Sequence, residues 1–235
     1  AALVVIDVEA SALAFFTDPA TGELRLACGC YKKVCIFDPV AGGEALLVLD
    51  IDDTGKRALA TFEDPATGSP LLACASEEKV LVSDPVAGGE ALVVLEIGDE
   101  VNALAVFKDP ATGAPRLACA SEKEALVFDP VAGGEALLAL DIGSRVLALA
   151  VFKEPATSAP RLACGSRGKV RIFDAVSGGD ALLVLNAGPM VWALVAFKDL
   201  ATGAPRLACG TREKVRVFDP VAGGEALVVL DVGDS

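Results

Sequence analysis

Apolar residues occur along this chain in short bursts, and turn-forming residues separate each burst from the next. Between residues 101 and 142, apolar-rich segments cover residues 103–107, 116–121, 125–129 and 135–142. Asp-Pro-Ala-Thr-Gly, Glu-Lys-Glu and Pro-Val-Ala-Gly-Gly sequences connect them. Segments this short, each bounded by Pro, Gly or Asp, are typical of β-strands and too short for helices. The pattern predicts four strands joined by tight turns.

This four-strand pattern recurs at a nearly constant spacing. A Leu-Ala-Cys step ends at Cys28, Cys74, Cys119, Cys164 and Cys209, at intervals of 46, 45, 45 and 45 residues. A unit of this length cannot close a hydrophobic core alone, so neighbouring units must bury each other's apolar faces. One domain over residues 1–235 is expected, with units near residues 10–51, 56–97, 101–142, 146–187 and 191–232. An additional terminal strand, residues 2–8, precedes the first unit.

Four antiparallel strands per unit, repeated radially, are the signature of a β-propeller blade. The residues resemble the WD40 family. Residues 207–211 (Leu-Ala-Cys-Gly-Thr) match its second strand, and residues 215–219 (Val-Arg-Val-Phe-Asp) match its third, with Phe-Asp in place of Trp-Asp. The family's Gly-His step is absent, so blade packing must depend on apolar burial and turn chemistry. The resemblance implies an all-β propeller of about five four-stranded antiparallel blades.

The terminal strands determine how the ring is expected to close. Residues 2–8 repeat residues 226–232 with one difference, Ile6 in place of Leu230. By resemblance to WD40 propellers, a terminal strand is expected to close a five-bladed ring, which removes open sheet edges and favours a monomer. The sequence leaves open which copy completes the last blade. Two alternatives also stay open: self-association through the surplus strand, or an open five-unit piece completed by a second chain.

Charge and composition exclude several classes of function. The chain has 33 acidic and 20 basic residues, a formal net charge of −13, and no histidine. Negative charge disfavours nucleic acid and anionic membranes as partners, and it also aids solubility. Without histidine, Ser-His-Asp and Cys-His catalysis and imidazole metal ligation are excluded. No apolar run approaches the ~18 residues of a membrane helix, and no signal peptide is visible.

The cysteines and glycines carry no evident chemistry. Equivalent cysteines of neighbouring blades should lie beyond the ~7 Å Cα limit for a disulfide, so we expect small buried hydrophobic residues. Cys28, Cys30 and Cys35 form a closer group, but their spacing matches no zinc pattern. The Gly-Gly steps lack the Lys-Ser/Thr and helix of a phosphate loop. We predict no metal, no cofactor and no catalytic residue, and free thiols indicate a cytoplasmic location.

The connections between strands form a uniform set and a variable set. The turns after the first and third strands are nearly constant, and in an up-and-down blade they share one face of the disc. On the opposite face, the residue entering the first strand is Ser11, Arg57, Asn102, Leu147 or Trp192 in successive units. The WD40 resemblance places this position at the mouth of the central channel, where the family commonly binds peptides or proteins. Candidate partner-binding residues are these five together with Met190, Tyr31, Arg145, Arg167 and Arg212.

Three functional hypotheses follow from this division. The leading one is a non-catalytic scaffold, similar to WD40 propellers, that binds a protein or peptide through the variable loops, with Trp192 as an interface anchor. Its alternative is that Trp192 packs under its own loop. A small-ligand or sugar-binding propeller would instead use one site per blade gap, near the uniform turns. A consensus-like or engineered repeat protein with no partner is the third, and an enzyme is not expected.

Overall fold

The computed structural model describes residues 4–51 and 58–233, and twenty β-strands form this part of the chain. They pair in sequence order into five four-stranded antiparallel sheets, here numbered as blades 1 to 5. The strands are β1 (Ala12–Thr17), β2 (Leu24–Cys30), β3 (Lys33–Phe37) and β4 (Leu47–Asp50) in blade 1; β5 (Leu59–Glu63), β6 (Pro70–Ala75), β7 (Lys79–Ser83) and β8 (Val93–Glu96) in blade 2; β9 (Ala103–Lys108), β10 (Pro115–Ala120), β11 (Glu124–Phe128) and β12 (Leu138–Asp141) in blade 3; β13 (Ala148–Lys153), β14 (Pro160–Gly165), β15 (Lys169–Asp174) and β16 (Leu183–Asn186) in blade 4; and β17 (Ala193–Lys198), β18 (Pro205–Gly210), β19 (Lys214–Phe218) and β20 (Val228–Asp231) in blade 5.

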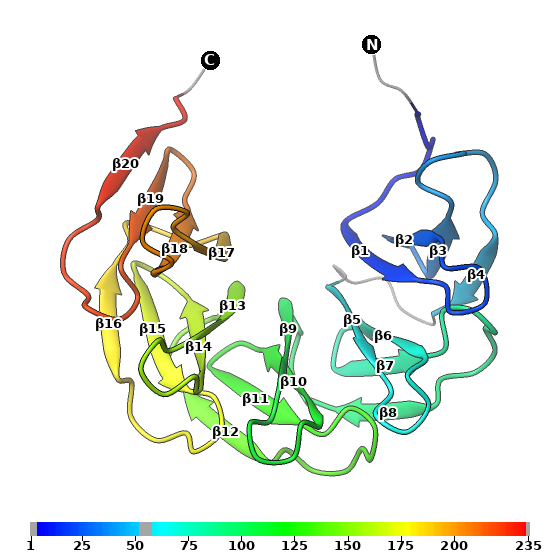
Figure 1. Cartoon of the computed structure of the whole chain (residues 1–235), viewed down its shortest axis with the longest axis horizontal. Coiled ribbons are helices and arrows are strands. Elements are labelled where there is room, and N and C mark those ends of the chain that lie inside the picture. The colour runs from blue at the N-terminus through cyan, green and yellow to red at the C-terminus, as the bar shows by residue number, and fades with distance from the viewer. Residues whose placement is uncertain (1–3, 52–57, 234–235) are drawn as a thin grey trace.

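The blades follow one another around an arc, with the first strand of each blade on the inside (Figure 1). Neighbouring inner strands contact each other along the arc: β1 with β5, β5 with β9, β9 with β13, and β13 with β17. The predicted all-β propeller of five four-stranded antiparallel blades is confirmed. The described residues contain no helix of the length and apolarity needed to cross a membrane.

The fourth strand of each blade is shorter than the sequence pattern suggests. In blade 3 the apolar segment 135–142 yields a strand only at β12. Gly133 and Gly134 both have positive φ, 71° and 87°, a conformation that glycine adopts without steric cost. The chain also bends at Glu135 and Leu137, so ladder pairing with β11 begins only at Leu138.

Each uniform turn is held by the carboxylate of its first residue. In the turn after β9, Asp109 Oδ1 accepts hydrogen bonds from the backbone N–H groups of Ala111 (2.9 Å) and Thr112 (3.2 Å). Asp129 does the same after β11, accepting from Val131 (3.0 Å) and Ala132 (2.9 Å). Such Asx-type turns explain why Asp begins nearly every copy.

An arginine on the second strand links the two uniform turns, a feature that the sequence analysis missed. Arg116 Nη2 lies 3.3 Å from Asp109 Oδ2, and Arg116 Nη1 lies 2.9 Å from Asp129 Oδ2. Arg25 and Arg206 each pair with both turns of their own blade, and Arg161 pairs with Asp174. Blade 2 has Leu71 at this position. The recurrence of an Arg 13 positions before an Asp was the sequence signal that could have predicted this ion pair.

These turns predict a loss of stability in acid. Hydrogen bonds from Ala111 and Thr112, and then the charge of Arg116, lower the pKa of Asp109 below its usual value of 3.8. The pKa values of Asp18 and Asp199 are lowered in the same way. Because the folded pKa lies below the unfolded one, the stabilisation is present above about pH 4 and is lost as the pH falls through the folded pKa. The urea midpoint should therefore be lower at pH 3 than at pH 6.

A matched variant isolates the carboxylates from the rest of the chain. In Asp109→Asn with Asp199→Asn, the amide oxygen can still accept the turn hydrogen bonds but carries no charge. At pH 6 the urea midpoint of this double variant should be lower than that of the parent chain. Between pH 6 and pH 3 its midpoint should fall by less. Equal acid sensitivity in the variant and the parent chain would contradict the role given to these carboxylates.

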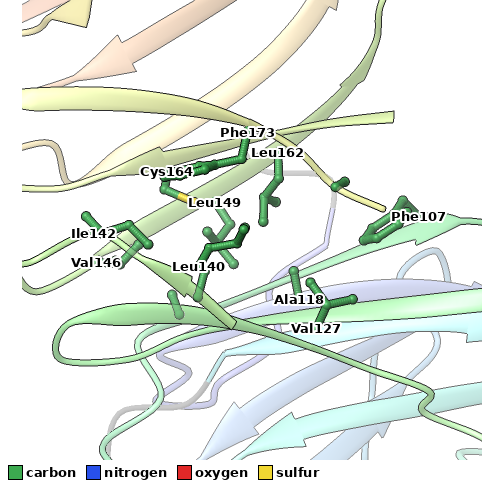
Figure 2. Close-up of a cluster of buried hydrophobic side chains, with 13 residues drawn as sticks. Phe107, Ala118, Val127, Leu140, Ile142, Val146, Leu149, Leu162, Cys164 and Phe173 are labelled. Atoms are coloured by element: carbon green, nitrogen blue, oxygen red, sulfur yellow. The ribbon is translucent and has the colours of Figure 1, made fainter. Parts of the chain in front are cut away.

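The hydrophobic core lies between blades rather than within them. At the joint of blades 3 and 4, Leu140 and Ile142 of blade 3 cluster with Leu162, Cys164 and Phe173 of blade 4 (Figure 2). Equivalent clusters join blades 2 and 3 and blades 4 and 5. Blades 2, 3 and 4 therefore each present one apolar face to the blade before and another to the blade after, as expected for a unit too short to fold alone.

The seven cysteines are buried and form no disulfide with one another, which confirms the prediction of small buried residues. Cys119, Cys164 and Cys209 have no exposed surface. Cys28 and Cys35 face each other across β2 and β3, in one apolar cluster with Cys30 and Phe37. Burial, the charge of Cys35 and a hydrogen bond to it raise the pKa of Cys30 to about 11. A thiol held in this protonated state is unreactive at neutral pH.

The described strands do not show the predicted closure by a terminal strand. β20 pairs with β19 and is itself the fourth strand of blade 5. The N-terminal segment, residues 4–8, packs instead against blade 1. The two ends of the arc lie apart, with blade 5 and blade 1 on either side of the opening (Figure 1).

Candidate functional site

The residue that enters each first strand has a fixed backbone and a variable side chain. The N–H groups of Ser11, Asn102, Leu147 and Trp192 each donate a hydrogen bond of 2.9 Å to a carbonyl near the end of the neighbouring second strand. Those acceptors are Gly29, Ala120, Gly165 and Gly210. Because the repeat holds only the backbone, the side chain at this position is free to differ between blades.

Three of these side chains meet at one pocket on the variable-loop face. The pocket has a volume of about 490 Å³ and spans the inner ends of blades 3, 4 and 5. Its lining consists of Asn102, Ser144, Arg145, Leu147, Arg167, Met190 and Trp192. Six of these seven were predicted from the sequence, and Ser144 was missed because a serine in a loop has no distinguishing pattern.

The apolar part of the pocket is formed by Leu147, Met190 and Trp192. Trp192 immediately precedes β17, and 55% of its surface is exposed. This exposure does not support the alternative in which the indole packs under its own loop. An accessible tryptophan beside a flexible methionine offers the type of surface on which binding energy concentrates in protein interfaces.

The polar part of the pocket is divided between two arginines. Arg145 is bound by blade 3: its Nε lies 3.0 Å from Glu122 Oε1, its Nη2 lies 2.8 Å from Asn102 Oδ1, and it also pairs with Glu100. Arg167, in the turn between β14 and β15, makes no ion pair within residues 4–51 and 58–233. Arg167 is therefore the cation available to a ligand, while Arg145 shapes the wall.

The remaining predicted residues lie outside this pocket. Tyr31 is 70% exposed on blade 1, with Lys32 Nζ 5.9 Å from its ring centroid. Ser11 and Arg212 are not part of the pocket lining. Arg57 lies outside the described residues. The predicted set thus divides into one group that shares a pocket and separate residues elsewhere.

A second cavity opens near the uniform turns. Its volume is about 820 Å³, and the equivalent residues Phe107, Phe152 and Phe197 line it together with Lys108, Lys153 and Lys198. Most of its other lining residues belong to the Asp-Pro and Glu-Pro turns and the strands next to them. The cavity extends across blades 3, 4 and 5. A similar cavity across blades 1, 2 and 3 is lined by the equivalent residues Phe16, Phe62 and Phe107, and a smaller one lies between blades 2 and 3.

Comparison with known proteins identifies a shared fold. No family model and no curated protein matches the sequence. Among solved structures, the chain is similar to BBS1N, crystallised in complex with ARL6DN, with a TM-score of 0.70, 13% identity, and coverage of 93% of this chain and 67% of that one. It is also similar to Sqt1 of Saccharomyces cerevisiae, with a TM-score of 0.69, 15% identity, and coverage of 87% and 57%.

A third similar structure belongs to a larger assembly. It is a chain of a humanised Chaetomium thermophilum Polycomb Repressive Complex 2 bound to the inhibitor GSK126, with a TM-score of 0.65, 15% identity, and coverage of 88% and 48%. The present chain therefore spans about half to two thirds of the length of these solved chains. At such identities the likeness establishes the fold.

Proposed function

We propose that this WD40-like β-propeller is a non-catalytic scaffold that binds a protein or peptide through the pocket of Leu147, Met190, Trp192 and Arg167. The fold is shared with proteins whose solved structures are complexes: BBS1N with ARL6DN, and a chain of Polycomb Repressive Complex 2. The partners in those structures are partners of those proteins and are not assigned to this chain. What supports the proposal is that chains of this fold occur in complexes with other polypeptides.

The observation that carries the proposal is the convergence of unlike side chains from three equivalent blades. Leu147 and Trp192 occupy the same repeat position, yet both lie in one pocket with Met190 and the cation of Arg167. An exposed apolar group beside an uncompensated cation favours a peptide that carries an apolar or aromatic side chain next to a carboxylate. The absence of histidine from the sequence also removes the commonest general base.

The sugar-binding alternative has less support. It requires near-identical sites in successive blade gaps. The two larger cavities near the uniform turns each span three blades, and a smaller cavity within a single gap lies between blades 2 and 3. A glycan array that gave a specific, saturable signal with the chain would favour that alternative over the peptide scaffold.

The proposal is tested by selecting ligands and then removing the anchor. Peptides selected from a displayed random library on the immobilised chain should share an apolar residue near Asp or Glu. In fluorescence anisotropy, Trp192→Ala should weaken binding of the selected peptides at least about tenfold, since truncating a central interface anchor commonly costs more than 1.4 kcal/mol. Arg167→Ala should weaken the acidic peptides and reduce their salt dependence.

Tyr31→Ala provides the matched control. Tyr31 is an exposed aromatic residue outside the pocket, so its removal should leave peptide affinity unchanged. Unchanged affinity in Trp192→Ala, or an equal loss in Tyr31→Ala, would show that the pocket is not the binding site.

A further inference from the structure

Blade 5 leaves open the face that every other blade buries against its successor. Phe152 of β13 is 7% exposed, whereas Phe197, at the same position of β17, is 44% exposed. Leu185 of β16 is 1% exposed, and its counterpart Leu230 of β20 is 53% exposed. Each pair consists of the same residue type in equivalent strands of blades 4 and 5. The exposed fractions differ because blade 5 covers blade 4 and no blade covers blade 5.

Blade 1 is open on its opposite face, the one that the other blades turn toward their predecessor. Leu13 of β1 is 59% exposed, whereas its counterpart Leu149 of β13 is 8% exposed. Phe15 is 51% exposed on the same strand. Leu26 of β2 is half-buried, whereas the equivalent Leu117 is fully buried by blade 2. The two ends of the arc therefore expose the two complementary apolar faces that pack together wherever neighbouring blades meet.

The N-terminal segment fills part of the joint at blade 1. Ile6 and Val8 pack with Cys28, Cys35 and Phe37 of blade 1. At the joint of blades 3 and 4, Leu140 of β12 and Ile142, which follows that strand, cluster in the same way with Leu162, Cys164 and Phe173. Residues 4–8 thus make the contacts that the fourth strand of a preceding blade makes.

A glycine contact fixes the register of this segment. A Cβ added to Gly42 would lie 2.7 Å from Val4 Cγ1. A Cβ added to the equivalent Gly223 of blade 5 would lie 2.7 Å from Leu183 Cδ1, and Leu183 is the first residue of β16. Val4 therefore stands where the fourth strand of a preceding blade begins. Residues 4–8 alternate between half-buried and exposed, as a one-sided strand does.

We propose that the two open faces bind additional blades of this same repeat, and that residues 4–8 are the fourth strand of the blade that lies against blade 1. β20 already holds the fourth position of blade 5, because it pairs with β19. Residues 4–8 therefore belong to a different blade, one that needs three further strands. The opening between blade 5 and blade 1 in Figure 1 is the place where such a blade fits.

The residues that this occupant must present follow from the joints within the chain. Toward blade 5 it offers the counterparts of Leu207, Cys209 and Phe218, which blade 5 offers to blade 4. Toward blade 1 it offers the counterpart of Phe152 in addition to residues 4–8, in which Ile6 is the counterpart of Leu185. One repeat unit meets both requirements when residues 4–8 take the place of its own fourth strand.

The test presents such blades to the chain at high effective concentration by fusion. Residues 191–224, or residues 146–224, are placed directly before Ala1, so that residues 2–8 follow a third strand as residues 226–232 do. The reporter is Leu230→Cys, and the measurement is the alkylation rate of that thiol, because the seven natural cysteines are buried. Extensions of the same composition but scrambled order are the matched control.

In the unextended chain, Leu230→Cys should react at least about a hundredfold faster than Leu185→Cys, since the first position is exposed and the second is buried. At least one ordered extension should slow the reaction of Leu230→Cys by tenfold or more, and the scrambled ones should not. Adding Ile6→Asp to the ordered extension should restore fast labelling.

Three results would overturn the proposal. The first is a rate that neither ordered extension changes, whether or not the added strands fold. The second is protection of Leu230→Cys in the unextended chain at every concentration, which would mean that blade 5 closes on blade 1. The third is protection that rises with concentration together with a dimer in light scattering, which would mean that a second copy occupies the face.

Discussion

Leu185→Ala should destabilise the chain by about 2–5 kcal/mol, and Leu230→Ala should cost less than about 1 kcal/mol, although both change the same residue of the repeat. Leu185 is 1% exposed and lies in the cluster that joins blades 4 and 5, so its removal loses apolar burial and leaves a cavity. Leu230 is 53% exposed, so truncation removes little buried surface. Urea unfolding of both variants measures the difference.

The two substituted residues share residue type and strand position, and they differ in the presence of a following blade. A similar contrast is expected between Phe152→Ala and Phe197→Ala. Equal costs within either pair would mean that blade 5 is covered in solution and that the arc is not open at that end.

Alkaline pH should unfold the chain earlier than its acidic composition suggests. Burial raises the pKa of the Cys119 and Cys164 thiols well above the ordinary value of 9.0. The folded pKa exceeds the unfolded one, so this contribution is complete below pH 9 and falls as the pH rises toward the folded pKa. For each thiol, the free energy of unfolding should fall by about 1.4 kcal/mol per pH unit in that window, or by about 2 kcal/mol at pH 10.5. Urea unfolding at pH 8 and pH 10.5 measures the loss.

The double variant Cys119→Ala, Cys164→Ala serves as the control for other titrating groups. It keeps every lysine and the tyrosine but lacks the two thiols, so its stability should fall less between pH 8 and pH 10.5. Parallel losses in the variant and the parent chain would show that these two thiols are not the source of the alkaline sensitivity.

The strands and their order could be predicted because each is bounded by residues with strong turn preferences. Asp109 and Gly113 close one turn, and Gly133 with Gly134 shapes another, so the boundaries follow from local chemistry. The burial of the cysteines could be predicted for a similar reason, since the Leu-Ala-Cys step recurs in a central strand. Local sequence does not encode the angle between successive blades, which explains why ring closure was not predictable.

The candidate site shows the same division between local and long-range information. Comparison of the repeats identified Asn102, Leu147 and Trp192 as variable, and the regular topology of the blades then placed their side chains at one pocket. Nothing local showed that Arg145 would be held by Glu100 and Glu122 while Arg167 stays available. The Arg116 link between uniform turns was missed because arginine on a strand ordinarily indicates a solvated position.

Small-angle X-ray scattering from the monomeric chain tests the central structural claim most directly. The scattering profile should match an arc of five blades whose first and last blades do not touch, with the larger maximum dimension that an open end gives. A profile that fits a closed five-bladed disc, with blade 5 against blade 1, would contradict the account.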